Sequence, residues 1–483
     1  MNHTFRLPRL VVDAAIAASA VGLAWAGDAS PLVLGLVAAA GLAFLVVEGC
    51  SFYNRPYPQP HDQPAQYELH TVQADDFGSF WKPHEADRVL HHVESCAQAG
   101  NTFVYVFIHG WNHNASPGDS NLRDFNRKTL AKLCRDLGTS SRRALRERMT
   151  GSAHFRLIGI YVGWRGRSLP GPLNFFTMWW RKAAAERVGE GDVSEFVERL
   201  QRIYLRANAL RRAPRDTEVK PMMGLVAIGH SFGGQVLLKS MAPSLEYALV
   251  ERASTQADVT RPAANAPAID VRVPVDSLGD LNILLNPATE AYQFGRIDAL
   301  YRQLRFPDSQ TPQLVVFSAD DDVPRKAFFP IARLLTLPFR PNFRDAYQGR
   351  LYGRALGVLP EQWTHEMRFA HGAPDSLGDA DYAADDGLRV RRFDFSDLAC
   401  FGGVQMRRLA GVPSLQPPIA NSPVSVVQVH EKIIDGHNGI FGEDFQHFLA
   451  AYVASVEGKR LMLRHESFVK ARAAQPDGED DGF

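Results

Sequence analysis

The sequence predicts an α/β fold in which helices cover both faces of a mostly parallel central sheet. Several runs of β-forming residues are continuously apolar, which is typical of strands that are buried on both faces. Helical patterns lie between these runs, so strands and helices alternate along the chain. The 483 residues are 45% hydrophobic and 22% charged, a globular composition with enough length for a large core.

The predicted strands are rich in β-branched and aromatic residues. Residues 67–72 (YELHTV) alternate between apolar and polar side chains, which predicts a half-buried strand. Denser runs predict fully buried strands at residues 101–111, 155–164, 224–228, 280–287, 313–322 and 424–430. Because helical segments separate these runs, we expect parallel strands joined by right-handed crossovers.

The predicted helices have apolar residues at helical spacing. They lie at residues 84–100, 121–137, 194–212, 233–249, 291–304 and 443–453. Residues 166–223 and 324–423 are too long for simple connections and are expected to be insertions in a domain of residues 67–470. The acidic tail, residues 471–483, is expected to be disordered.

Two apolar stretches at the N-terminus predict a membrane hairpin within residues 1–50. Residues 10–26 and 31–47 each reach the lower limit of ~17 residues for a spanning helix. Arginines lie before the first stretch and after the second, at positions 6, 9 and 55, and the turn between the stretches has no Lys or Arg. The positive-inside rule then puts both ends, and the domain that follows, on the cytoplasmic side of the cytoplasmic membrane.

Two alternatives for this segment stay open. Residues 24–26 (AWA) resemble a signal-peptidase site, so the first stretch could be a cleaved signal. Cys50 could be lipidated, although Glu48 fits that poorly. Residues 51–66 are rich in Pro and polar residues and are expected to form an extended linker to the domain.

Charge and cysteine content exclude several classes of function. Lys and Arg total 53, as do Asp and Glu, so the net charge of +0 gives no general attraction to nucleic acid. The four cysteines lie far apart, at positions 50, 96, 134 and 400, and predict reduced thiols. The chain has no Walker loop, dinucleotide fingerprint or metal-ligand spacing, so we expect neither a cofactor nor a metal.

A single serine lies on a predicted sharp bend, in the segment GLVAIGHSFGGQVLL (residues 224–238). An apolar strand ends at Ile228, and a helix begins directly after the bend. Gly229 and Gly233 lack the Cβ atoms that would clash where strand and helix pack closely. This context predicts strained backbone at Ser231 and a hydroxyl that projects from the sheet edge as a nucleophile.

Three motifs together resemble the α/β-hydrolase superfamily, in particular serine esterases and lipases. They are HGWNHN (residues 109–114), GHSFG (229–233) and DGHNGIF (435–441). The resemblance covers residues 101 to about 453 without the two insertions. It implies an eight-stranded, mostly parallel sheet and a catalytic triad in the chain order Ser, acid, His.

The resemblance also indicates the base that a serine hydroxyl needs at neutral pH. Family order places this histidine between the last strand and the last helix, where His437 lies with Gly436 and Gly439 beside it. His430 is nearer the strand and is expected to be structural. His447 lies within the predicted helix and is expected to pack.

The triad acid has several candidates. Asp320, Asp321 and Asp322 follow a predicted strand, and the spacing to the next Val-Pro favours Asp321. Asp320 is a strong alternative, and Glu290, after a neighbouring strand, is a weaker one. The other acids of the cluster would be solvated or would cap the next helix.

Two backbone amides are expected to hold the oxyanion of the reaction. One is the N–H of Phe232 at the start of the helix, and the other is the N–H of Trp111 in the loop after the 101–111 strand. Gly110 would keep this loop free of side chains, and His109 would orient it through a hydrogen bond.

The segment LNFFTMWWRK (residues 173–182) in the first insertion has two open interpretations. It could be a lid or interfacial helix with Arg181 and Lys182 on anionic lipid. It could equally be a helix packed on the domain core.

The sequence therefore predicts a membrane-anchored serine hydrolase that cleaves carboxylic esters through an acyl-enzyme. A small-molecule or lipid ester would be the substrate, the anchor and the aromatic insertion favouring lipid. The alternatives are an acyltransferase or thioesterase with the same triad, and a non-catalytic membrane scaffold on a hydrolase fold.

Overall fold

The computed structural model describes residues 54–60, 64–169, 177–209, 221–254, 268–328, 342–383, 388–395, 397–410 and 419–473, together with residues 35 and 174. The larger of two compact units comprises Arg55–Gly166 and Met178–Phe483, and the sheet lies within it. Apart from Gly35, the predicted membrane hairpin lies outside the described residues. None of the helices within the described ranges is long and apolar enough to cross a membrane.

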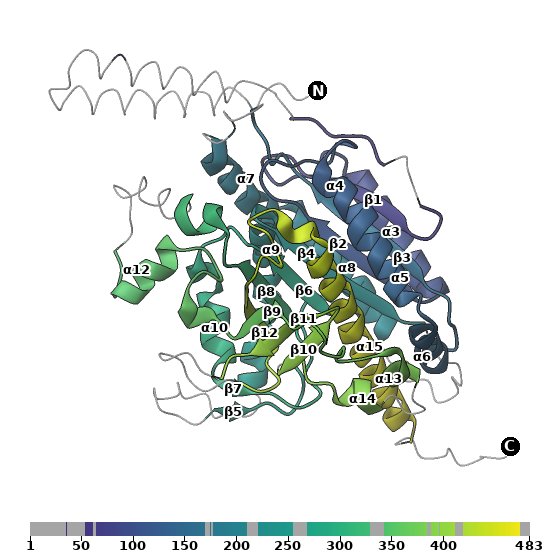
Figure 1. Ribbon diagram of the computed structural model, residues 1–483. Helices are drawn as coiled ribbons and strands as arrows, with labels where there is room; N and C mark the ends of the chain where they lie inside the picture. Colours follow the sequence, from purple (N-terminus) through teal and green to yellow (C-terminus); the bar gives the residue numbers. More distant parts are fainter. Residues whose placement is uncertain are drawn as a thin grey trace. The chain divides into compact units, whose positions relative to one another are not determined.

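In the described residues, ten strands form one sheet in the order β1-β3-β2-β4-β6-β8-β12-β9-β11-β10 (Figure 1). Neighbouring strands from β1 to β9 are all parallel, and β11 and β10 are added antiparallel at the far edge. The bounds are β1 Glu68–Gln73, β2 Thr102–Ile108, β3 Arg156–Gly163, β4 Met223–His230, β6 Leu281–Leu285, β8 Leu314–Ala319, β9 His365–Phe369, β10 Leu398–Phe401, β11 Val404–Arg408 and β12 Val424–Val429. The predicted α/β class with a mostly parallel sheet is confirmed.

The sheet is buried on both faces because its strands are apolar on both sides. All seven residues of β2 are buried. Successive side chains of a strand point to opposite faces, and those of β2 divide accordingly between two hydrophobic cores. Phe103, Tyr105 and Phe107 join one core, while Val104 and Ile108 join the other. This division explains why the run lacks the alternation of a half-exposed strand.

Helices cover each face of the sheet. One core contains side chains of α3 Pro83–Ala99, α7 Met178–Glu190, α8 Asp192–Asn208, α9 Phe232–Ser254 and α10 Gly295–Tyr301. The other contains side chains of α5 Ala131–Leu137, α6 Ser140–Thr150, α13 Asp379–Ala383, α14 Leu388–Arg392 and α15 Glu443–Ala473. Shorter elements are α4 Ser120–Asp124, α12 Ala346–Gly353, the π-helical turns η1 Phe125–Leu130 and η4 Pro324–Phe328, the 3₁₀ turns η3 Ala291–Phe294, η6 Pro360–Gln362 and η7 Gly439–Phe441, and the pair β5 Ile269–Asp270 and β7 Leu304–Arg305.

The second predicted insertion extends the sheet, which was not expected. Residues 324–423 include β9, β10 and β11, and this is why the sheet exceeds the eight strands that the resemblance implies. A two-residue turn, Gly402-Gly403, joins β10 to β11, with φ of 59° and 74°. Left-handed backbone at both central residues suits this kind of hairpin turn and is easily adopted by glycine.

Part of the predicted linker belongs to the folded unit. The Tyr57 N–H donates to Gln73 Oε1 at 2.8 Å, and Gln73 Nε2 donates to the Tyr57 carbonyl at 2.8 Å. Gln59 makes similar exchanges with the backbone of Thr71. These bonds hold residues 57–59 beside β1, so this part of the predicted extended linker packs on the folded unit. At the other end, α15 continues to Ala473, three residues past the predicted domain boundary.

Candidate active site

Ser231 lies on a strained bend between β4 and α9, as the sequence predicts. Its φ is 56°, in the left-handed region that non-glycine residues rarely adopt. Three backbone bonds enforce this: its N–H donates to the Leu285 carbonyl at 3.0 Å, and its carbonyl accepts from the N–H groups of Gly234 and Ala288, each at 3.0 Å. Strain of this kind costs about 1–3 kcal/mol and persists only where the surroundings fix it.

The predicted glycines are needed because backbones meet at this bend. A Cβ on Gly229 would lie 2.5 Å from the Gly233 carbonyl oxygen. A Cβ on Gly233 would lie 2.0 Å from the Ile108 carbonyl oxygen, at the end of β2. Both contacts are too short for any real Cβ, so these two positions accept glycine alone without backbone movement.

His437 is the histidine that reaches the serine. Its Nε2 lies 2.7 Å from Ser231 Oγ, although the two residues are 206 positions apart. Its backbone carbonyl accepts hydrogen bonds from His230 Nε2 at 2.9 Å and from Asn286 Nδ2 at 3.1 Å. The loop after β12 is therefore fixed by groups at the ends of β4 and β6.

Asp322 holds the position next to the imidazole, so the expectation of Asp321 is wrong. Asp322 Oδ2 lies 2.7 Å from His437 Nδ1, and the Asp322 side chain is fully buried. Asp321 instead accepts a hydrogen bond from the Gly436 N–H at 3.0 Å and so anchors the loop that carries His437.

The alternative acids and bases lie elsewhere. Asp320 Oδ2 is 2.7 Å from His430 Nδ1, which makes these two residues a separate, partly exposed pair. Glu290 is buried and pairs with Lys182 at 2.9 Å. His447 lies within α15 and packs against the Gly402 turn.

Sequence reasoning missed the partner of the acid. Arg325, fully buried, donates from Nε to Asp322 Oδ2 at 2.6 Å. Its remaining guanidinium nitrogens donate to the Leu356 carbonyl at 3.0 Å and to Ser318 Oγ at 2.8 Å. Burial alone would raise the pKa of Asp322, but the Arg325 charge and the His437 hydrogen bond hold that pKa well below its usual range. The acid is thus ionised at neutral pH.

A local signal for this arrangement is present in the sequence. The Arg325 N–H donates to Asp322 Oδ1 at 3.0 Å, as an aspartate does when it caps a helical turn. An Asp followed three residues later by Arg at the start of a helix fits this pattern. Asp322 combines both expected roles, because its Oδ1 caps the turn and its Oδ2 faces the histidine.

His109 orients the loop after β2 as a neutral group. Its Nε2 accepts from the Trp164 N–H at 2.9 Å, so its Nδ1 carries the proton and donates to the Gly110 carbonyl at 2.8 Å. The ring stacks on Trp164 with centroids 5.4 Å apart. Full burial is the main cause that lowers the pKa of His109 to about 4. The expected hydrogen bond is present, and its geometry leaves the imidazole no free nitrogen for use as a base.

The loop with Trp111 approaches the serine directly. A Cβ on Gly110 would lie 2.6 Å from Ser231 Cβ and 3.3 Å from Ser231 Oγ. Phe232 is the first residue of α9, where backbone N–H groups lack partners within the helix. The two expected amide donors thus belong to segments that adjoin Ser231: the loop after β2 and the start of α9.

His230, directly before Ser231, is a further buried imidazole. It donates from Nε2 to the His437 carbonyl, and the two rings lie 5.2 Å apart. Burial, and then the nearby His437, hold the pKa of His230 well below its ordinary value. His230 is therefore a neutral hydrogen-bond donor that holds the His437 backbone in place.

The helix of the aromatic insertion packs on the core. Residues 178–190 form α7, which lies against α9. Arg181 pairs with Asp76 at 2.7 Å and Lys182 with Glu290, and both cations are buried. Of the two open interpretations, the buried ion pairs of Arg181 and Lys182 favour the helix packed on the domain core over cations on anionic lipid. Phe175 and Phe176 lie outside the described residues.

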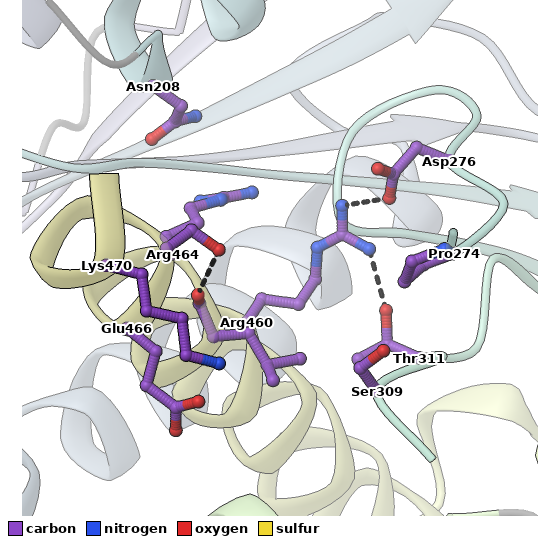
Figure 2. A pocket seen from close by; sticks show the side chains of 11 residues that line it. Asn208, Pro274, Asp276, Ser309, Thr311, Arg460, Arg464, Glu466 and Lys470 are labelled. Carbon is purple, nitrogen blue, oxygen red and sulfur yellow. Dashed lines mark hydrogen bonds and ion pairs between the residues drawn. The ribbon is translucent and has the colours of Figure 1, made fainter. Parts of the chain in front are cut away.

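A separate cavity of about 450 Å³ lies at the other end of the sheet, near the start of the strands (Figure 2). The two arginines that line this cavity form hydrogen bonds and ion pairs with other residues of the protein. Arg460 binds Asp276 and Thr311 Oγ1, each at 2.7 Å, and Arg464 binds Asp280 at 2.6 Å. The serine lies at the carboxyl ends of the parallel strands, so this cavity is no part of its site.

Comparisons of the chain with models of protein families, with curated proteins and with solved structures give no match.

Proposed function

We propose that this chain is a membrane-anchored serine hydrolase that cleaves carboxylic esters through an acyl-enzyme. The observation that carries the proposal is one continuous chain of contacts. Asp322 Oδ2 lies 2.7 Å from His437 Nδ1, and His437 Nε2 lies 2.7 Å from Ser231 Oγ. A nucleophile, a base within hydrogen-bond reach and a third group that orients the base are the parts that nucleophilic catalysis by serine needs.

The reaction follows from these contacts. His437 Nε2 accepts the hydroxyl proton as Ser231 Oγ attacks the acyl carbonyl carbon, and Asp322 stabilises the imidazolium that forms. The amides of Trp111 and Phe232 stabilise the tetrahedral oxyanion. The imidazolium returns its proton to the leaving alcohol as the carbon–oxygen bond breaks. A water molecule, activated by the same imidazole, then releases the acid and restores the serine.

The topology supports the proposal of an α/β-hydrolase fold. The serine follows β4, the acid follows β8 and the histidine follows β12, which is the chain order that the resemblance implies. These three strands are parallel and belong to adjacent positions β4-β6-β8-β12 of the sheet. Their carboxyl ends therefore lie at one edge, where α/β proteins hold their ligands.

The alternative functions use the same serine in a different reaction or in none. An acyltransferase would deliver the acyl group to an alcohol in place of water, and a thioesterase would accept a sulfur leaving group. A scaffold would need no nucleophile in reach of a base, so the 2.7 Å contact between Ser231 and His437 favours an enzyme.

Covalent labelling tests the proposal. The full chain is treated with a fluorophosphonate, which reacts with activated serines. We expect labelling of the wild type and of His430→Ala, and none of Ser231→Ala or His437→Ala. Absence of label on a folded wild type would contradict the proposal. Product analysis of a short-chain ester with competing alcohols then separates hydrolysis from acyl transfer.

The membrane anchor is part of the proposal because of the two apolar stretches in residues 1–50. We expect the full chain to stay with membranes after alkaline extraction and a chain that begins at residue 51 to be released. A reporter fused after Phe483 should be active in the cytoplasm, and an exported reporter would contradict the predicted orientation.

A further inference from the structure

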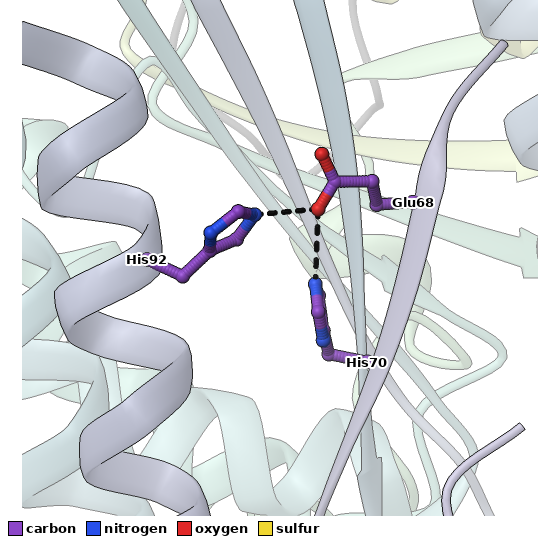
Figure 3. Close-up of side chains that lie close together, drawn as sticks. All are labelled: Glu68, His70 and His92. Atoms are coloured by element: carbon purple, nitrogen blue, oxygen red, sulfur yellow. Dashed lines mark hydrogen bonds and ion pairs between the residues drawn. The ribbon is translucent and has the colours of Figure 1, made fainter.

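Two histidines and a glutamate converge at the edge of the sheet, apart from the serine. Glu68 and His70 lie two positions apart on β1, so their side chains leave the strand on the same face. His92 reaches them from α3 (Figure 3). Glu68 Oε2 lies 2.5 Å from His92 Nε2 and 3.3 Å from His70 Nε2. One ligand atom from each residue lies within 4.8 Å of the other two.

We propose that Glu68, His70 and His92 bind a divalent transition-metal ion, with Zn²⁺ the best match. Two imidazoles and one carboxylate form a donor set that zinc uses when a fourth position is left for water or another ligand. Ligand bonds of about 2.0–2.1 Å in a tetrahedron place neighbouring donor atoms about 3.3 Å apart. The pair of Glu68 and His70 already has this separation. The shorter pair with His92 needs only a small rotation of side chains that are about one-third exposed.

The surroundings also suit a metal. Cys96, one turn after His92 on α3, places its Sγ 3.7 Å from His92 Nε2 and adds a soft donor beside the cluster. Arg156 Nη1 lies 3.9 Å from Glu68 Oε1, the oxygen that does not face the histidines. Arg156 can thus orient the carboxylate from behind while Oε2 binds the ion, which is the usual role of a second layer of contacts around a metal. Its side chain is 58% exposed and is able to move away from the cation.

The cluster is distant from the serine. Glu68 is in register with Ile158 of β3, which is in register with Val104 of β2, and Val104 is paired with Leu225 of β4. Leu225 is six residues before Ser231, or about 20 Å along the strand. A metal at the cluster would link the edge strand β1 to α3, and its loss should leave the chemistry at Ser231 intact.

Metal binding is measured on the full chain in detergent, by competition for Zn²⁺ with a chromophoric chelator. We expect one ion per chain. His92→Ala should weaken binding by about 100-fold or more, because loss of even a second-layer contact costs 10–100-fold. His91→Ala is the matched control: it removes the neighbouring, exposed imidazole of the same helix and should bind as the wild type does.

Glu68→Gln tests metal binding in a variant that should still fold. The amide keeps a hydrogen-bonding oxygen for the histidines but loses the charge that a metal needs. We expect Zn²⁺ to raise the melting temperature of the wild type and of His91→Ala, but not of Glu68→Gln or His92→Ala. Co²⁺ bound to the wild type should give the intense visible absorption of a tetrahedral site. Equal Zn²⁺ affinity in the wild type, Glu68→Gln and His92→Ala would overturn the proposal, as would the absence of any stoichiometric binding.

Discussion

Arg325 Nε lies 2.6 Å from Asp322 Oδ2, the same oxygen that faces His437 Nδ1 at 2.7 Å. Both side chains are almost completely buried. The carboxylate is therefore held from two directions, and the orientation of the histidine depends on a residue that does not touch it. Breaking a buried ion pair by removing one partner is costly, because the other charge stays buried without compensation.

Asp322→Asn should reduce kcat by about 10⁴, because an amide supports the wrong tautomer of the histidine. It should also lower the free energy of unfolding, because the buried charge of Arg325 loses its partner. Asp321→Asn is the control. It weakens one bond to the Gly436 N–H and should cost far less. Steady-state hydrolysis of a short-chain ester gives both values, and a larger loss for Asp321→Asn would contradict the assignment of the acid.

Arg325→Met should lower the free energy of unfolding by about 3–5 kcal/mol, the usual effect of breaking a buried pair. It should also lower kcat, since Asp322 Oδ2 loses the guanidinium that helps to hold it. Arg325→Lys keeps the charge but lacks the several donors of a guanidinium, and should recover part of both losses. Lys326→Met changes the adjacent, exposed cation and should leave kcat and stability near wild type. Urea unfolding and ester hydrolysis are the measurements, and unchanged kcat in Arg325→Met would refute a positioning role.

Gly110→Ala should abolish most of the activity without unfolding the chain. The added Cβ would lie 2.6 Å from Ser231 Cβ and 2.9 Å from the His230 carbonyl oxygen. Either the loop or the nucleophile must shift, and a shift of this size misplaces the reacting groups. Gly118→Ala, where a Cβ has no atom within 4 Å, is the control. Near-normal ester hydrolysis in Gly110→Ala would show that this loop does not border the reacting carbonyl.

His109 should make the protein less stable in acid. Its pKa is about 4 in the folded protein and 6.5 in the unfolded chain. As the pH falls from 6.5 to 4, the unfolded chain binds a proton that the folded protein excludes, so stability is lost over this window. The loss approaches about 3 kcal/mol at 1.36 kcal/mol per pKa unit. Urea midpoints between pH 7 and 4 should fall more steeply for the wild type than for His109→Gln, and equal slopes would contradict the buried neutral imidazole.

The strands could be predicted because strands buried on both faces have continuous runs of apolar residues, which are easy to recognise in a sequence. The β2 run and the Ser231 bend with its glycines are local features, and the structure has both. The hairpin of β10 and β11 also has a local signal, the Gly402-Gly403 pair, but the strands beside it have only four and five residues. Such short runs do not differ enough from loop sequence.

The choice among three consecutive aspartates could not be made from the sequence. Asp320, Asp321 and Asp322 bond to three different partners: the His430 ring, the Gly436 N–H and the His437 ring, in that order. The conformation of the turn after β8 determines which side chain faces which partner. The cluster of Glu68, His70 and His92 could not be predicted for a similar reason. Glu68 and His92 are 24 positions apart, and only the packing of α3 against the sheet edge brings them together.

The contacts of Ser231 have a consequence for synthesis of the chain. The serine leaves the ribosome long before His437, which belongs to the last loop before α15. A nascent chain therefore carries the hydroxyl through the synthesis of the next 206 residues before the imidazole that would activate it is made. If the proposed chemistry holds, truncated or stalled products that lack His437 stay inert, and hydrolysis begins only after the loop with His437 has been made and β12 has entered the sheet.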